Sequence, residues 1–207
     1  MSDLRQRRLY LCVGLRDDLA TLIPAVVAGG VDVVQLRDKD RPASDVLGAA
    51  ATLAARCRDL GVPFIVNDSP EIALDAGADG VHVGQDDASV ERCRELLGGD
   101  AIVGLSTHEP REFDAGLLAD TSYLSAGPIE ATPTKPGRPG TGVDYAAACQ
   151  RRSDRPVFVT GGVRADNVGA LVGAGLRHFV VVRAVLDARD PAAAAREIRD
   201  AIEAALA

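Results

Sequence analysis

The chain has 207 residues and a formal net charge of −7, and 47% of its residues are hydrophobic while only 3% are aromatic. An acidic chain lacks the basic footprint of a nucleic-acid-binding protein, so that class is disfavoured, although a few gathered cations can still bind phosphate groups. The length fits one domain, and a core of Val, Ile, Leu and Ala is typical of strands that helices cover on both faces.

The cysteines and the N-terminus indicate where the protein works. The four cysteines, Cys12, Cys57, Cys93 and Cys149, lie far apart without a CxxC pair, which favours reduced core thiols. The N-terminus has no apolar signal region, and no stretch approaches ~18 apolar residues. We expect a soluble cytoplasmic protein without a membrane partner. The sequence leaves the oligomeric state open, a homo-oligomer included.

Short β-branched runs alternate with Ala- and Leu-rich helical segments along the whole chain. Eight such alternations predict a parallel sheet, and their natural closure is a (β/α)8 TIM barrel forming a single domain over residues 1–207. An open doubly wound sheet is the alternative. The predicted strands are 9–13, 31–36, 63–67, 79–83, 101–105, 122–126, 156–160 and 178–182.

In such a barrel the chemistry belongs to the rim, meaning the C-terminal ends of the strands and the loops that follow them. After the second predicted strand, "QLRDK" alternates Gln35, Arg37 and Lys39, so these side chains leave the strand end on one side. Arg37 offers a planar fork for phosphate oxygens, and Lys39 offers a point charge. A solvated loop with an Arg37–Asp38 pair is the alternative.

Acidic residues follow the third and fourth predicted strands. Asp68 and Asp87 are expected on adjacent loops, because neighbouring strands lie about 4.8 Å apart, although each could simply cap a helix. Two carboxylates without a Cys or His cluster suit Mg²⁺, which takes one or two protein carboxylates plus water and phosphate oxygens. The same rim carries three cations, Arg37, Lys39 and Lys135, which predicts that a pyrophosphate completes the coordination shell of the Mg²⁺ ion.

Two further polar residues lie at strand ends. Ser106, after the fifth predicted strand, is expected either to donate to a phosphate oxygen or to cap the next helix. No spacing supplies it with an activating base, so a nucleophilic serine is disfavoured. His82 is expected to be a hydrogen-bonded strand-end histidine rather than a metal ligand or base.

The stretch 127–142 is rich in Pro and Gly and has little to bury. Structureless loops beyond about 12–15 residues are uncommon and are often functional. Thr132, Thr134 and Lys135 supply hydroxyl and ammonium donors. We interpret the loop as a lid that closes over an anionic substrate and excludes water, with a mobile tether as the alternative.

The loops after the last two predicted strands carry backbone donors. Gly161 and Gly162 allow close approach of N–H groups, and a helix start at "VVRAV" points further N–H groups at the rim. These loops form the common monophosphate site of such barrels. The rim therefore predicts two anion sites without a clear base or nucleophile. A reaction that suits this set joins two phosphorylated substrates by expelling pyrophosphate.

The motifs "QLRDK", "GADGVHVGQDD" and "GPIEATPTK" together resemble the thiamin-phosphate synthase (thiamine-phosphate pyrophosphorylase) family, and the likeness runs over nearly the whole chain. The resemblance implies a (β/α)8 transferase that uses Mg²⁺. It would condense 4-amino-2-methyl-5-hydroxymethylpyrimidine diphosphate with a thiazole phosphate, or its carboxylated form, to give thiamin phosphate and pyrophosphate. Pyrophosphate would depart first, leaving a pyrimidine-methyl cation that the thiazole nitrogen captures.

The same resemblance implies roles for individual residues. Asp68 and Asp87 would bind Mg²⁺. The residues implied in catalysis are Arg37, Lys39, Ser106 and Lys135. The residues implied in binding the pyrimidine diphosphate are Gln35, Leu36, Arg37, Asp38, Lys39, Asn67, Ser106 and Lys135. Those implied in binding the thiazole phosphate are Thr132, Pro133, Thr134, Gly162, Val182 and Arg183. Arg183 stands where the family commonly has Ser.

Three other functions stay open at this point. A thiazole tautomerase on the same barrel would need a placed base such as His82 or His108. A non-catalytic regulator would bind thiamin phosphate without turnover. A sugar-phosphate isomerase barrel would explain "TGGV" but not the diphosphate loops. The complete diphosphate set favours the synthase.

Overall fold

The computed structural model describes residues 4–132 and 139–207, so the predictions for Pro133, Thr134 and Lys135 lie outside the described residues. Eight parallel strands close into a barrel in chain order, and the last strand pairs with the first. This confirms the predicted (β/α)8 fold against the open sheet. The strands are β1 (Leu9–Val13), β2 (Val33–Leu36), β3 (Phe64–Asn67), β4 (Gly80–Val83), β5 (Ile102–Thr107), β6 (Tyr123–Ala126), β7 (Val157–Val159) and β8 (His178–Val181).

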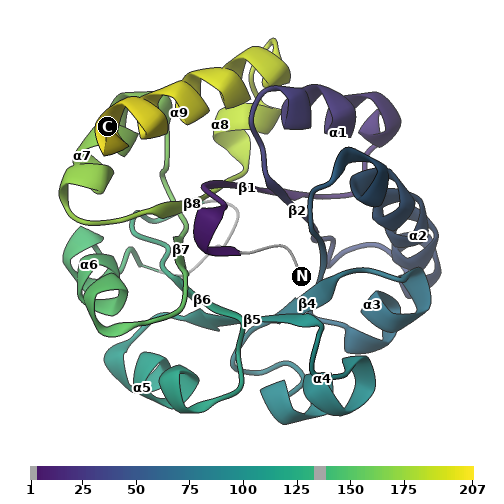
Figure 1. Ribbon diagram of the computed structural model, residues 1–207. Coiled ribbons are helices and arrows are strands. Elements are labelled where there is room, and N and C mark those ends of the chain that lie inside the picture. The colour runs from purple at the N-terminus through teal and green to yellow at the C-terminus, as the bar shows by residue number, and fades with distance from the viewer. Residues whose placement is uncertain (1–3, 133–138) are drawn as a thin grey trace.

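Helices form a ring around the barrel (Figure 1). The unit after β8 is divided between a short helix and the long C-terminal one, which packs against the helices on either side of it, α7 and α1. The helices are α1 (Leu19–Ala28), α2 (Ala43–Leu60), α3 (Pro70–Ala76), α4 (Val90–Leu97), α5 (Pro110–Leu118), α6 (Val143–Arg152), α7 (Ala165–Gly173), α8 (Arg183–Leu186) and α9 (Pro191–Leu206).

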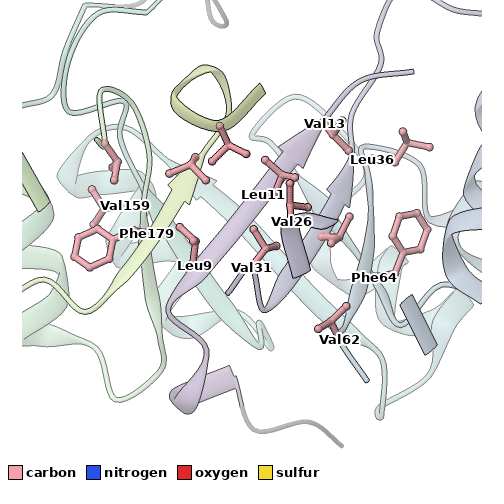
Figure 2. Close-up of a cluster of buried hydrophobic side chains, with 14 of the residues drawn as sticks. Leu9, Leu11, Val13, Val26, Val31, Leu36, Val62, Phe64, Val159 and Phe179 are labelled. Atoms are coloured by element: carbon pink, nitrogen blue, oxygen red, sulfur yellow. The ribbon is translucent and has the colours of Figure 1, made fainter. Parts of the chain in front are cut away.

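The strands are buried on both faces, as parallel strands between a filled interior and a helical shell must be. All five residues of β1 are buried. Alternate residues such as Leu9, Leu11 and Val13 join the layer between sheet and helices (Figure 2), and Tyr10 faces the barrel interior with a second cluster. The outer layer consists mostly of aliphatic side chains, as the composition predicts.

The interior of the barrel changes from apolar to polar along its axis. The short 3-10 helix η1 (Leu4–Gln6) lies across the centre of the ring in Figure 1, and Leu4 packs into the interior cluster with Phe158. Gly104 leaves space for the ring of Tyr123, which a β-carbon at that position would strike. Beyond this layer the inward positions are polar, and they form the floor of a cavity. The buried polar residues there are Gln35, His82, Ser106 and Ser125.

The four cysteines are all buried and free of disulfides, as expected of core thiols. Among the residues that the structure describes, no helix has the length and apolar character needed to cross a membrane.

Candidate active site

A cavity of about 620 Å³ lies at the C-terminal ends of the strands. It draws its walls from loops spread over the whole chain, so the barrel gathers residues that the sequence keeps far apart. Most of the predicted site residues are found there. They are Gln35, Arg37, Lys39, Asn67, Asp68, Asp87, Ser106, Thr132, Gly162, Val182 and Arg183.

Two predicted residues of the "QLRDK" segment, at the end of β2 and in the loop after it, do not line this cavity. Leu36 is buried in the layer between sheet and helices. The Asp38 carboxylate accepts hydrogen bonds from the backbone N–H of Leu15 at 3.0 Å and of Arg41 at 3.1 Å. Asp38 therefore shapes the loop that carries Arg37 and Lys39.

Lys39, Asp68 and Asp87 form a charged cluster on one wall of the cavity. Lys39 Nζ lies 2.8 Å from Asp68 Oδ2, and the carboxyl groups of Asp68 and Asp87 are close enough to shift each other's pKa. The backbone of Asp68 has a φ of 67°, in the left-handed region that non-glycine residues seldom adopt. An observed outlier of this kind at a cavity supports a functional role for the residue.

Neither aspartate is used as a helix cap, although capping was the alternative for both. Ser69 Oγ accepts the capping hydrogen bond of α3 from Ile72 N at 3.1 Å, and Ser89 Oγ accepts that of α4 from Arg92 N at 3.2 Å. Asp87 Oδ2 instead accepts from Gly84 N at 2.7 Å across its own loop. Serines take the capping role, which leaves both carboxyl groups facing the cavity.

The pKa values of these two neighbouring carboxyl groups shift in opposite directions. Burial raises the pKa of Asp68, and the Asp87 carboxyl beside it adds to that rise against the opposing effect of Lys39. Burial works in the same direction on Asp87, but hydrogen bonds from Asp68 and from Gly84 N–H bring the pKa of Asp87 below its ordinary value. Asp68 is therefore the weaker acid of the pair, as expected where two carboxyl groups occupy one site.

A chain of buried hydrogen bonds lies under this cluster. Gln35 Nε2 donates to the Tyr10 hydroxyl at 2.9 Å, and Tyr10 and Tyr123 hydroxyls lie 3.0 Å apart. His82 Nδ1 lies 2.8 Å from the Tyr123 hydroxyl, and His82 Nε2 lies 2.8 Å from Ser106 Oγ. Burial raises the pKa of Tyr10 and that of Tyr123, so both phenols keep their hydrogens.

Donation can run in one direction along this chain, from Gln35 through both tyrosines to His82 Nδ1. His82 then carries its hydrogen on Nε2 and donates it to Ser106. In that arrangement the Ser106 hydroxyl keeps its own hydrogen for a ligand in the cavity. His82 is therefore a hydrogen-bonded histidine, as expected, and Ser106 lies inside β5 rather than capping α5.

The opposite wall is built from backbone. Gly161 and Gly162 both have positive φ, at 90° and 80°, and Val182 precedes the first turn of α8. Among the described residues, none accepts a hydrogen bond from the backbone N–H of Gly161 or Gly162. Thr132 and Arg183 line the same side of the cavity. This wall offers donors to an anion, across the cavity from the acidic cluster.

Several lining residues were not identified from the sequence as site residues. Tyr10 and Tyr123 look like ordinary strand residues in the sequence, and only the register of β1 and β6, which turns them inward, shows that they line the cavity. Arg164 follows "TGGV" directly and was overlooked as a cation. His108, named only as a base for a tautomerase, lies on the cavity wall with Nδ1 2.9 Å from Glu112 Oε2. The spacing of His108 and Glu112, one helical turn apart, could have indicated this pair.

Comparison with known proteins places these motifs in a family. The thiamine monophosphate synthase family model matches residues 9–185. The chain is 44% identical over 218 residues to a thiamine-phosphate synthase of Mycobacterium tuberculosis, covering 99% of this chain and 98% of that protein. It is also 44% identical over 199 residues to the Thermus thermophilus thiamine-phosphate synthase, covering 93% and 96%.

A solved structure agrees with this comparison. The thiamine phosphate pyrophosphorylase from Pyrococcus furiosus superposes with a TM-score of 0.89 at 26% identity, covering 99% of this chain and 100% of that chain. The residues matched by the family model, 9–185, include all eight strands of the barrel. The chain belongs to the thiamine monophosphate synthase family.

Proposed function

We propose that this protein is a transferase that condenses 4-amino-2-methyl-5-hydroxymethylpyrimidine diphosphate with a thiazole phosphate, giving thiamin phosphate and pyrophosphate. Family membership supports the joining of a pyrimidine and a thiazole moiety. One observation of the structure carries the proposal further. A single cavity places the Lys39–Asp68–Asp87 cluster on one wall and backbone donors of Gly161, Gly162 and α8 on the other.

The acidic cluster fits Mg²⁺. Its donors are carboxylate oxygens, which hard cations prefer, and the cavity beside them has room for water and phosphate oxygens. After the effect of burial, the neighbouring Asp87 carboxyl raises the pKa of Asp68, and a divalent cation held by both carboxylates would offset their mutual repulsion. Asp68 and Asp87 would hold the ion, which when bound neutralises charge on the departing diphosphate.

The side chains around the cluster supply the rest of the diphosphate site. Arg37 presents a planar fork for phosphate oxygens, and Lys39 brings an ammonium that is already at the acidic cluster. Ser106 donates one hydroxyl hydrogen, directed by the chain from Gln35 to His82. These groups stabilise negative charge where it grows as the leaving group departs, which is the main demand of this reaction.

The bond changes need no general base. The bond between the pyrimidine methylene carbon and the diphosphate oxygen breaks, and its electron pair leaves with pyrophosphate. The lone pair of the thiazole nitrogen then forms the carbon–nitrogen bond, and that nitrogen has no proton to lose. His82 has both ring nitrogens at hydrogen-bond distance of buried hydroxyls, which suits a positioning role better than the base of a tautomerase.

The direct test mixes the purified protein with both substrates and Mg²⁺ and follows pyrophosphate and thiamin phosphate together. We expect the two products in equal amounts, and neither when one substrate is omitted. Binding of thiamin phosphate without turnover would identify a regulator instead. Proton exchange on the thiazole without pyrophosphate release would identify a tautomerase.

A further inference from the structure

The described ends of the long loop between β6 and α6 are tied to the loop after β7. Ile129 N donates to Thr160 O at 2.8 Å, and Gly142 N donates to Ile129 O at 3.2 Å. Thr141 N donates to Pro128 O at 2.7 Å, which joins the two ends of the loop to each other. The backbone immediately before Glu130, at Pro128 and Ile129, is therefore held in place beside the glycine wall.

The Glu130 side chain lies directly over Gly162. Its carboxyl group fills the space that a β-carbon of Gly162 would take, so a larger residue there would push the Glu130 carboxyl group aside. Glu130 Oε2 is 3.1 Å from Arg164 Nη1, and the same nitrogen donates to Gly162 O at 2.7 Å. A carboxylate and a guanidinium from two different loops thus meet at the glycine that was predicted to bind phosphate.

Both side chains can still exchange partners. About half of each is exposed, at 47% for Arg164 and 53% for Glu130. Exposed ion pairs contribute little to stability, and exposed side chains change rotamer rapidly. Because the backbone is anchored, leaving this position requires only rotation of the Glu130 side chain.

We propose that Glu130 is a built-in anion at the monophosphate site, and that Arg164 is a further phosphate-binding residue. On substrate binding, Arg164 exchanges the Glu130 carboxylate for the phosphate of the thiazole substrate. This inference rests on the proposed function for the identity of that substrate. The site itself takes any small phosphate.

The chemistry favours the exchange. A phosphate monoester carries about −1.5 to −2 charges near pH 7 against −1 for a carboxylate, and it brings more acceptor oxygens. The guanidinium can bond two of those oxygens at once, and Gly161 and Gly162 can add backbone N–H donors. A thiazole alcohol without phosphate has no charge with which to displace Glu130, so the pair also selects for the phosphorylated substrate.

The test measures inorganic phosphate binding at this wall of the cavity alone. The amide resonances of Gly161 and Gly162 in a ¹⁵N NMR titration report binding there, separately from phosphate bound near Lys39. Glu130→Gln keeps the shape of the side chain and removes its charge. We expect it to lower the phosphate Kd about two- to fivefold, the range expected of one exposed charge pair. Arg164→Gln should raise the Kd by a similar factor.

The control is Asp114→Asn, which removes the carboxylate of another exposed arginine pair, that of Arg152, on the outer helices. It should leave the phosphate Kd unchanged. In the Arg164→Gln background, Glu130→Gln should tighten binding less than it does alone. If Glu130→Gln leaves phosphate binding unchanged or weaker, the pair is only a tie between two loops and the proposal is wrong. An unchanged Kd in Arg164→Gln removes Arg164 from the phosphate site.

This outcome is separable from that of the proposed function. If the wild type shows no synthase turnover but the phosphate Kd of the Glu130 and Arg164 variants changes as expected, the anion site stands and the proposed synthase function is wrong. If the wild type turns over normally but the variants leave the phosphate Kd unchanged, the synthase function stands and the anion site is wrong.

Discussion

Tyr123→Phe removes one oxygen from the middle of the buried hydrogen-bonded chain and leaves the aromatic packing in place. The ring of Tyr123 lies 5.2 Å from that of Phe158 and 6.1 Å from that of Tyr10, centroid to centroid, and a phenylalanine ring keeps both contacts. In the variant, His82 Nδ1 and the Tyr10 hydroxyl each lose the hydrogen bond that the Tyr123 hydroxyl makes in the wild type.

The expected cost follows from those two groups. A buried polar group that loses its partner costs about 1–3 kcal/mol, so for the two groups we expect the free energy of unfolding to fall by about 2–6 kcal/mol. For a chain of this size such a loss lowers the Tm by roughly 5–25 °C. Turnover should fall as well, because His82 no longer holds the hydrogen on Nε2 that orients Ser106.

Urea unfolding followed by circular dichroism measures the change, with the m-value expected to stay constant. Tyr145→Phe is the matched control, since its partly buried hydroxyl has one hydrogen to share between Thr107 Oγ1 at 3.0 Å and Glu109 O at 3.1 Å. We expect this variant to lose less stability than Tyr123→Phe. A Tyr123→Phe protein within ~0.5 kcal/mol of wild type, the range of an ordinary surface substitution, would refute a continuous buried chain.

Three further predictions concern other parts of the barrel. Burial lowers the pKa of His178 from 6.5 to about 4. The unfolded chain therefore binds the extra proton between these values, and stability that is complete above pH 6.5 falls by about 3 kcal/mol by pH 4. Urea titrations over this range should show a flatter profile for His178→Gln, and parallel profiles would contradict the assignment. Ser106→Ala should lower kcat for pyrophosphate release by about 10²-fold, since one donor to the growing charge is lost. It should also cost about 1–3 kcal/mol of stability, because His82 Nε2 loses its buried acceptor; an unchanged kcat would remove Ser106 from catalysis. Arg155 reaches the carbonyl oxygens of Leu117 and Ala119 at 2.6 and 2.7 Å. Arg155→Lys should cost about 1–3 kcal/mol in urea unfolding because an ammonium cannot span both, and an unaltered midpoint would count against this.

The barrel could be predicted because local and global signals agree. Parallel strands buried on both faces are apolar along their whole length, and β1 and β2 appear in the sequence as unbroken apolar runs apart from Gln35. The exact ends of the strands and their pairing register were harder to predict from the sequence. The sequence placed Ser106 after its strand, while β5 continues through Thr107 because its ladder with β6 extends to Ala126.

The site was predictable where charge follows a strand end, and hidden where a role depends on register or on contacts between loops. Asp68 and Asp87 could be placed on neighbouring loops from strand order alone. The chain from Gln35 to Ser106 depends on which residues of five strands face inward, and the Glu130–Arg164 pair joins two loops that no sequence spacing relates. The capping serines, Ser69 and Ser89, lie one and two residues beyond the aspartates, so sequence could not decide which residue caps.

The central claim is that Asp68 and Asp87 together hold the magnesium ion that assists departure of the diphosphate. The most direct measurement is the rate of pyrophosphate release against Mg²⁺ concentration for wild type, Asp87→Asn and Asp86→Asn, with the exposed neighbour Asp86 as the control for charge. We predict saturation with Mg²⁺ in wild type and in Asp86→Asn, and loss of both turnover and Mg²⁺ response in a folded Asp87→Asn protein. An Asp87→Asn protein that keeps the wild-type rate and Mg²⁺ dependence would contradict the claim.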